Sequence, residues 1–263
     1  HAYASGCVDD DARLGDSSNW LDKVLDIREY DVAYHQRVAI DTGRRVGLWY
    51  TVREAEAGRA AIAPLPERKA FGDPRVLAYD IECVKQPLRF PDANTDAVMM
   101  ISYMIDGQGY LIINRETVGE DIDSFEYTPK PEFSGPFEVF NEPDELSLLR
   151  RFITHIRELQ PTIMVTYNGD NFDWPYVAKR CEVFGVALET ELGFEATNDG
   201  YFVSPSITHI DCIHWVKRDS YLPAGSHGLK AVCRAKLGYE PLEIDPEDMT
   251  RFAFEQPQLM ASY

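Results

Sequence analysis

Short apolar runs separated by polar turns dominate the middle of the chain. Residues 76–82 (VLAYDIE) are a short run, mostly apolar up to Asp80 and Glu82, which predicts a strand. Residues 97–105 and 109–115 are two further apolar runs, and the segment between them, Asp106-Gly107-Gln108, is typical of a tight turn. We therefore expect two antiparallel strands joined as a hairpin.

Helical and strand patterns alternate beyond this hairpin. Residues 142–160 carry Leu149, Ile153 and Ile156 at helical spacing and are followed by Pro161, which predicts an amphipathic helix. Further patterns predict a strand at 162–168, a helix at 174–185, a short strand at 206–211 and a helix at 229–238. This order indicates an α/β fold, a mixed sheet flanked by helices.

The remaining segments have weaker patterns. Residues 1–22 are polar and acidic, and we expect them to be irregular. Two β-rich runs within residues 24–52 flank Asp41-Thr42-Gly43, which predicts a second hairpin. Residues 53–75 are rich in Ala, Pro and charge and are interpreted as a linker, and residues 116–141 as a long irregular loop.

Composition narrows the class of protein. The 263 residues are 44% hydrophobic and 12% aromatic, enough for a sizeable core. No segment approaches the roughly 20 consecutive apolar residues of a membrane helix, and no signal peptide is recognisable. The five cysteines are scattered without a Cys-x-x-Cys pair, which favours a reducing compartment, the cytosol or nucleus. Because the chain begins at His1 rather than Met, we expect a piece of a longer protein.

The net charge of −18 is unusual for a protein that binds nucleic acid, because Lys and Arg supply most of the affinity for phosphates. The charge is unevenly distributed, however. Residues 116–148 hold ten acids and one lysine, whereas residues 214–236 hold five Lys or Arg and one acid. A local basic face can therefore coexist with an acidic loop, although either run is also compatible with ordinary solvated surface.

Two carboxylates share one face of the first predicted strand. Asp80 and Glu82 are separated by Ile81, so their side chains project together while Ile81 enters the core. Paired carboxylates favour a hard cation such as Mg²⁺, which prefers oxygen ligands. Taken alone, this pattern also fits two solvated acids.

A second candidate group lies between the strand at 162–168 and the following helix. Asn168, Phe172 and Asp173 occur where ligands bind in open α/β sheets, and an aromatic ring can stack on a base. The alternative is structural, because an Asp directly before Trp174-Pro175 is a common N-cap and Asp170 suits a turn.

The third group comprises His209, Asp211 and His214, followed by the basic residues Lys217 and Arg218. The His-x-Asp-x-x-His spacing matches no zinc signature, so we interpret the histidines and Asp211 as mainly structural. Lys217 and Arg218 can contact the phosphates of a nucleic-acid backbone, or they can be ordinary solvated surface residues. The sequence has no Gly-x-Ser-x-Gly elbow, no phosphate-binding loop and no cysteine in a catalytic context.

Together these segments resemble the exonuclease domain of B-family DNA polymerases. The resemblance covers roughly residues 24–263 and is carried by long runs in the same order: residues 25–43, YDIE at 79–82, and residues 98–112, 161–177 and 215–232. It implies a ribonuclease H-like (DnaQ-like exonuclease) mixed sheet flanked by helices, preceded by part of a β-rich amino-terminal domain. The implied domains are residues 1–72, part of that domain plus a linker, and residues 73–263, the exonuclease domain.

The resemblance also implies a two-metal 3′→5′ proofreading nuclease using Mg²⁺ or Mn²⁺. Asp80 and Glu82 match the ligands of the first motif, and Asp173 matches the acid of the second. Asn168 and Phe172 match positions that face the DNA 3′ end. Cys83-Val84 stands where the family usually has Thr-Thr, which we expect to alter packing more than chemistry.

Only the first residue of the third family motif, Tyr-Ser-x-x-Asp, is present in this sequence. Tyr263 matches its tyrosine, which orients the attacking water, and the fourth carboxylate would follow the last residue. The resemblance implies a full protein that synthesises DNA in the nucleus and carries its iron–sulfur or zinc sites outside this chain. Its implied partners are a single-stranded 3′ end or a primer–template, and other polymerase subunits. Two alternatives are a catalytically dead exonuclease fold that binds DNA or subunits, and a ribonuclease or repair nuclease with the same carboxylates.

Overall fold

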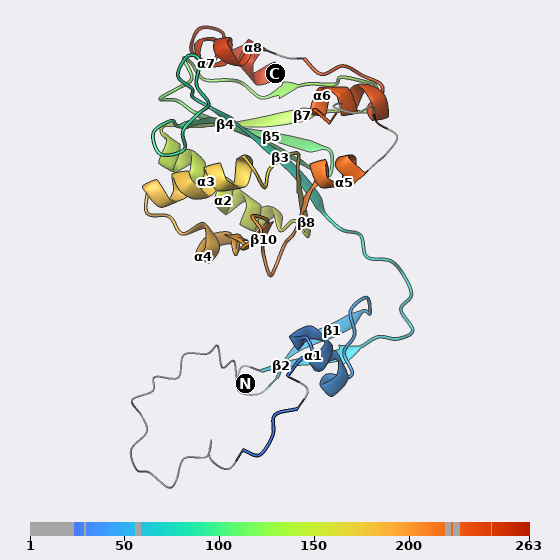
Figure 1. Cartoon of the computed structure of the whole chain (residues 1–263). Coiled ribbons are helices and arrows are strands. Elements are labelled where there is room, and N and C mark those ends of the chain that lie inside the picture. Colours follow the sequence, from blue (N-terminus) through green and yellow to red (C-terminus); the bar gives the residue numbers. More distant parts are fainter. Residues whose placement is uncertain (1–23, 29, 56–58, 219–221, 223–226, 243) are drawn as a thin grey trace, which may run out of the picture. The chain divides into compact units, whose positions relative to one another are not determined.

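The computed structural model describes residues 24–28, 30–55, 59–218, 222, 227–242 and 244–263 (Figure 1). The chain divides into two compact units, His1–Gly72 and Asp73–Tyr263. Our expectation for residues 1–22 lies outside the described residues. In the part that is described, no helix has the length and apolar character needed to cross a membrane.

The first unit contains a helix and a two-stranded sheet. Helix α1 (Tyr34–Thr42) ends at Gly43, whose φ of 67° is the left-handed conformation that commonly terminates helices. The predicted hairpin around residues 41–43 is therefore wrong, because this glycine closes a helix instead of reversing a strand. Strand β1 (Tyr50–Ala55) pairs antiparallel with β2 (Arg59–Pro64), so the segment predicted as a linker also contains a hairpin.

A seven-stranded mixed sheet forms the centre of the second unit, in the order β11-β8-β3-β4-β5-β7-β6. Its strands are β3 (Val76–Cys83), β4 (Val98–Ile105), β5 (Gln108–Asn114), β6 (Phe125–Glu126), β7 (Pro136–Glu142), β8 (Ile163–Thr166) and β11 (Thr208–Asp211). The predicted tight hairpin is confirmed: Asp106 and Gly107 both have positive φ, as a type I′ turn between β4 and β5 requires.

The segment 116–141, predicted to be an irregular loop, contributes two strands to this sheet. β7 pairs in parallel with β5, and the short β6 pairs antiparallel with β7 at the edge. The prediction is wrong because β7 includes Pro136, Glu138 and Asn141 and none of its residues is fully buried, so it lacks the apolar pattern of the inner strands.

Helices cover both faces of the sheet (Figure 1). On one face, α2 (Glu145–Leu159) and α3 (Asp173–Val183) supply Leu149, Phe152 and Trp174 to the larger core cluster. On the other face, α7 (Pro246–Glu255) and α8 (Pro257–Ser262) pack Met249 and Met260 against β4 and β5. The predicted α/β architecture, a mixed sheet flanked by helices, is confirmed.

Capping explains where α2 begins. The Asp144 side chain accepts a hydrogen bond from the Ser147 backbone N–H, and Gln160 ends the helix in the left-handed conformation just before Pro161. The predicted helix at 229–238 is present as α6 (Leu229–Val232) followed by a π-helical turn, η4 (Cys233–Leu237), that ends at Gly238.

The remaining elements are short and lie beyond α3. They are α4 (Leu188–Leu192), the two-stranded sheet of β9 (Glu195–Ala196) and β10 (Phe202–Val203), and α5 (Cys212–Arg218). We predicted neither α7 nor α8, although Asp245-Pro246 is a helix start: Asp245 accepts from the Glu247 N–H and Pro246 occupies the first turn.

Candidate active site

Strand β3 presents Asp80 and Glu82 on the face of the sheet that lies opposite α2 and α3. Leu77, Tyr79 and Ile81 alternate with them and belong to the core under those helices. The two carboxylates line a cavity of about 220 Å³ together with the carboxyl end of α8, including Tyr263. The structure therefore brings together Asp80, Glu82 and Tyr263 as the sequence indicated.

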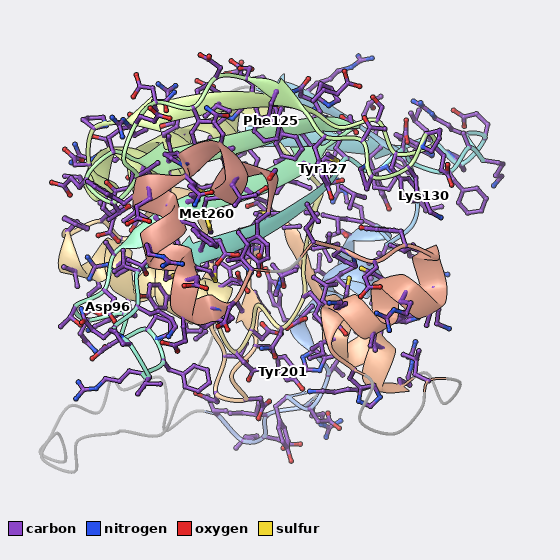
Figure 2. All side chains as sticks on the ribbon, turned by 90° about the horizontal axis from the view of Figure 1, so that it is seen from above. Asp96, Phe125, Tyr127, Lys130, Tyr201 and Met260 are labelled. Atoms are coloured by element: carbon purple, nitrogen blue, oxygen red, sulfur yellow. The ribbon has the colours of Figure 1, made fainter. Side chains whose placement is uncertain are left out.

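Apolar and aromatic side chains make up much of the rest of this cavity's lining. Phe125, Tyr127 and Met260 line the cavity, and Figure 2 shows Met260 on its helix with Phe125 and Tyr127 nearby at the sheet edge. Phe125 and Phe137 stack with their ring centroids 5.1 Å apart. These aromatic residues belong to the segment that the sequence analysis treated as a loop, so their contribution to the site was missed.

Asp173 reaches β3 from the first turn of α3. Its Oδ1 accepts a hydrogen bond from the Ile81 backbone N–H at 3.2 Å, and only 2% of the residue is exposed. Phe172, not Asp173, occupies the N-cap position, and no side chain caps this helix. The N-cap alternative for Asp173 is therefore wrong, because this carboxylate is directed at the strand that carries Asp80.

The three carboxyl groups are electrostatically crowded. Burial raises the pKa of Glu82 to about 8, and the charges of Asp80 and Asp173 add to this effect. Burial also raises the pKa of Asp80, and burial together with the charge of Asp80 raises the pKa of Asp173 to about 8. Three adjacent anions are therefore unfavourable here unless a positive charge is bound between them.

A larger cavity of about 820 Å³ begins on the other side of Glu82. Asn168, Phe172, Lys85 and residues 88–91 line it, together with Glu247 and Met249 from α7. The ring of Phe172 lies 5.5 Å from that of Tyr176, which packs it against α3. The predicted DNA-facing residues Asn168 and Phe172 thus border the same cavity as Glu82.

The loop between β8 and α3 is held in an uncommon conformation. Asn168 has a φ of 69°, and its backbone N–H donates to Asp211 Oδ1 at 2.7 Å. The next residue must be glycine, because a Cβ on Gly169 would lie 2.3 Å from Thr166 Oγ1. The N–H of Asp170 donates to Asp211 Oδ2, so a single carboxylate organises the loop.

Asp211 and His209 therefore have the structural roles that we expected. Both ring nitrogens of His209 are engaged: Nδ1 donates to the Phe202 carbonyl at 3.0 Å, and Nε2 bonds to the Thr166 hydroxyl at 2.9 Å. The structure adds one feature that sequence spacing did not reveal. Asp170, Asp211 and His214 place potential metal-ligand atoms within 4.8 Å of one another.

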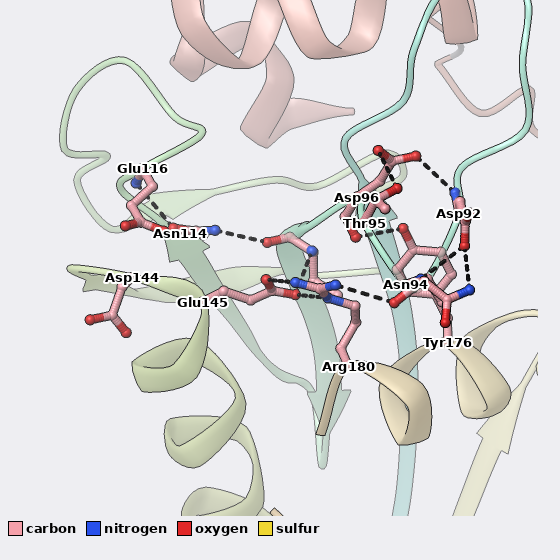
Figure 3. Close-up of polar contacts among 12 residues, drawn as sticks. Asp92, Asn94, Thr95, Asp96, Asn114, Glu116, Asp144, Glu145, Tyr176 and Arg180 are labelled. Carbon is pink, nitrogen blue, oxygen red and sulfur yellow. Dashed lines mark hydrogen bonds and ion pairs between the residues drawn. The ribbon is translucent and has the colours of Figure 1, made fainter. Parts of the chain in front are cut away.

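The loop between β3 and β4 forms a wall of the larger cavity, and a buried ion pair anchors its end (Figure 3). Arg180 of α3 donates to both carboxylate oxygens of Glu145 of α2, and Glu145 also accepts from the Val98 N–H at 2.9 Å. Arg180 donates a further hydrogen bond to the Ala93 carbonyl. The other end of the loop is tied to α7, where Lys85 pairs with Glu247.

Sequence reasoning missed this loop as part of the site. Leu88 and Phe90 are over 90% exposed there, and Leu88 has a φ of 59°. No local sequence pattern identifies exposed apolar residues of this kind as part of a site.

Lys217 and Arg218 lie exposed at the end of α5, and their predicted contact with DNA stays a prediction.

Comparison with known proteins places the chain in a family. Residues 25–232 match the family described as "DNA polymerase family B, exonuclease domain". The chain belongs to the family B DNA polymerases. The resemblance that we inferred from its motifs is thereby confirmed.

Relatives within family B are close. The chain is 57% identical over 252 residues to the catalytic subunit of DNA polymerase epsilon from Emericella nidulans, a match that covers 96% of the chain and 11% of that protein. It is 54% identical over 240 residues to the corresponding protein from Saccharomyces cerevisiae, covering 91% of the chain and again 11% of the relative. The chain thus spans about a tenth of the length of the curated relatives that it matches.

The fold of the chain is also found in a solved family B polymerase. The structure of the family B DNA polymerase from Pyrobaculum calidifontis matches with a TM-score of 0.64 at 22% identity, covering 90% of this chain and 30% of that one. This similarity supports the expected fold, a ribonuclease H-like mixed sheet.

Proposed function

We propose that this chain is the 3′→5′ proofreading exonuclease region of a DNA polymerase epsilon catalytic subunit. The observation that carries the proposal is the convergence of Asp80 and Glu82 with Asp173, more than ninety positions away in sequence, beside a cavity lined by Asn168 and Phe172. In the complete subunit, which also synthesises DNA in the nucleus with its partner subunits, this region would hydrolyse single-stranded 3′ ends.

The three carboxylates fit divalent cations. Asp173 is buried and Asp80 and Glu82 line the cavity beside it, the pKa values of all three are raised, and no Lys or Arg in the described part of the chain forms an ion pair with them. Carboxylate oxygens are the ligands that Mg²⁺ and Mn²⁺ prefer. We propose that Asp80, Glu82 and Asp173 hold two such ions, which lower the pKa of a bound water and stabilise the leaving oxygen when they are present.

The other residues position the substrate. Phe172 would stack on the terminal base, and Asn168 would bond to the terminal nucleotide. Tyr263 would orient the attacking water, and Lys217 and Arg218 would contact backbone phosphates. Because this cavity accepts only a separated strand in our proposal, a mismatched end, which separates at lower cost, is removed preferentially.

The test replaces both acids of β3 in the complete subunit. We expect Asp80→Ala with Glu82→Ala to abolish degradation of a 5′-labelled single strand while primer extension continues. The control replaces two exposed acids of the same unit, Glu116→Ala with Glu120→Ala, and should degrade DNA at the wild-type rate. Full nuclease activity in the Asp80/Glu82 variant contradicts the assignment.

The wild-type protein separates the remaining alternatives in the same assay. If it binds a single strand but degrades none with Mg²⁺ or Mn²⁺, the domain is a binding module. Faster degradation of RNA than of DNA would instead indicate a ribonuclease.

A further inference from the structure

A second cluster of potential ligands lies at the β8–α3 loop. Asp170 comes from that loop, Asp211 from the end of β11 and His214 from α5. They border a hollow of about 460 Å³ that Asp199 and Tyr201 also line, and Tyr201 is labelled in Figure 2. Two segments distant in sequence, the β8–α3 loop and residues 211–214, thus bring two carboxylates and one imidazole close together.

The buried carboxylate of Asp170 faces the imidazole of this cluster. Asp170 Oδ1 accepts from the Phe202 N–H at 2.7 Å, whereas no hydrogen bond to Oδ2 is present among the described residues. The Asp170 side chain is only 6% exposed, and its Oδ2 lies 3.4 Å from His214 Nε2. Oδ2 and the imidazole nitrogen therefore face each other across a gap that a cation can bridge.

We propose that Asp170, Asp211 and His214 form a binding site for a divalent transition-metal ion, with Zn²⁺ as its probe. Zn²⁺ binds carboxylate oxygen and imidazole nitrogen at about 2.0–2.2 Å, so tetrahedral ligands lie roughly 3.3–3.6 Å apart. The 3.4 Å separation of Asp170 Oδ2 and His214 Nε2 matches that spacing, and all three ligand atoms lie within 4.8 Å of one another. The imidazole favours Zn²⁺ over Mg²⁺.

The hollow leaves room for a fourth ligand. Asp199 lines it and can supply a carboxylate, or a water can complete the coordination. His209 is not a ligand, because both of its nitrogens are used by Phe202 and Thr166. The site therefore has three fixed ligands and one adjustable position.

An ion at this site acts on the neighbouring candidate active site through the backbone. Asp211 accepts from the N–H groups of Asn168 and Asp170, and the same loop continues into Phe172 and Asp173. Binding therefore fixes the loop that presents Asn168 and Asp173. The site is independent of Asp80 and Glu82, so the proposal does not rest on the nuclease assignment.

The experiment uses the 263-residue chain with Asp80→Asn and Glu82→Gln, which removes metal binding by those acids. The chain is freed of metal, and ZnCl₂ is titrated in competition with a chromophoric zinc chelator. We expect one tightly bound Zn²⁺ and a rise in the thermal midpoint on addition of zinc. Adding His214→Ala should weaken binding at least tenfold and remove the rise.

His35→Ala in the same background is the matched control, because His35 is an exposed histidine of the first unit. It should bind zinc as the parent does. His214 is 43% exposed, so its replacement should leave the circular dichroism spectrum unchanged. A second variant, Asp170→Asn, keeps an acceptor for Phe202 and should also lose the zinc.

Either of two results overturns the proposal. The first is a parent chain that binds no zinc in competition with the chelator. The second is zinc affinity that is equal in the parent, the His35 variant and the His214 variant, which would place the ion elsewhere.

Discussion

Glu82 makes the stability of the metal-free chain depend on pH. Burial beside Asp80 and Asp173 raises the pKa of its carboxyl from an ordinary 4.5 to about 8 in the folded chain. The folded chain therefore holds a proton that the unfolded chain releases between these values. The stabilisation is complete below about pH 4.5 and is lost as pH rises through about 8.

Replacing this carboxyl by an amide should remove part of that dependence. In EDTA at pH 8, we expect Glu82→Gln to increase the free energy of unfolding by about 1–3 kcal/mol. This is less than the free energy that the full pKa shift of Glu82 corresponds to, because the site is partly open to solvent. At pH 4 the variant should match the wild type, since both are then uncharged. The variant should still lose stability as pH rises, because the pKa values of Asp80 and Asp173 are also raised. Urea denaturation at both pH values measures the change.

Glu120→Gln is the control, because it makes the same replacement at an exposed position. It should leave the pH profile unchanged. Identical profiles for wild type and Glu82→Gln would show that Glu82 ionises freely in the folded chain. Added Mg²⁺ should bring the wild-type stability at pH 8 up to that of the variant.

Some site residues could be predicted from the sequence because strand geometry is local. Asp80 and Glu82 share a face by alternation alone, whatever the rest of the fold. Asp173 required the family resemblance, because its local pattern fits an N-cap equally well. The cluster of Asp170, Asp211 and His214 could not be predicted, since it depends on how β11 and α5 pack beside the loop.

At the scale of elements, the Arg180–Glu145 pair joins two helices to the loop that borders the larger cavity. The side chains are 6% and 3% exposed, so the charges are well removed from water. Glu145 also holds the Val98 N–H, and Arg180 holds the Ala93 carbonyl (Figure 3). Removing either partner leaves an uncompensated buried charge.

We expect Arg180→Ala to destabilise the chain by about 3–5 kcal/mol, the usual range for breaking a buried pair. Arg157→Ala is the matched control, because Arg157 pairs with Glu191 on the surface, where the side chains are 64% and 40% exposed. That replacement should lower stability by less than about 1 kcal/mol. Guanidinium denaturation of both variants gives the comparison, and similar losses would contradict the buried role of Arg180.

Elements were predictable where burial left a clear apolar pattern. The inner strands β3, β4 and β5 were found as short, mostly apolar runs, and helix α2 by its amphipathic period. β7 was missed because it lies near the sheet edge with mixed polarity, and α1 because it buries no residue that would mark a helical face. Periodicity reports burial, so elements with little burial are difficult to recognise.

At the scale of the whole chain, the two units differ in how they are stabilised. Both core clusters are built from residues between Leu77 and Met260, all within the second unit. In the described part of the first unit, α1 has no buried residue and β2 is exposed along its length. The second unit thus carries its own core, whereas a helix and a two-stranded sheet of this kind are marginal by themselves.

A chain of residues 73–263 should therefore fold independently. We expect it to unfold in one cooperative thermal transition, with a midpoint within about 2 °C of the main transition of the full chain and an enthalpy of roughly 0.7 kcal/mol per residue. Residues 1–72 alone should show no comparable transition. Calorimetry of the three chains makes the comparison. A fall of more than about 5 °C in the shorter chain would mean that the first unit stabilises the second, since losing about 1 kcal/mol lowers the midpoint of a domain this size by only 2–4 °C.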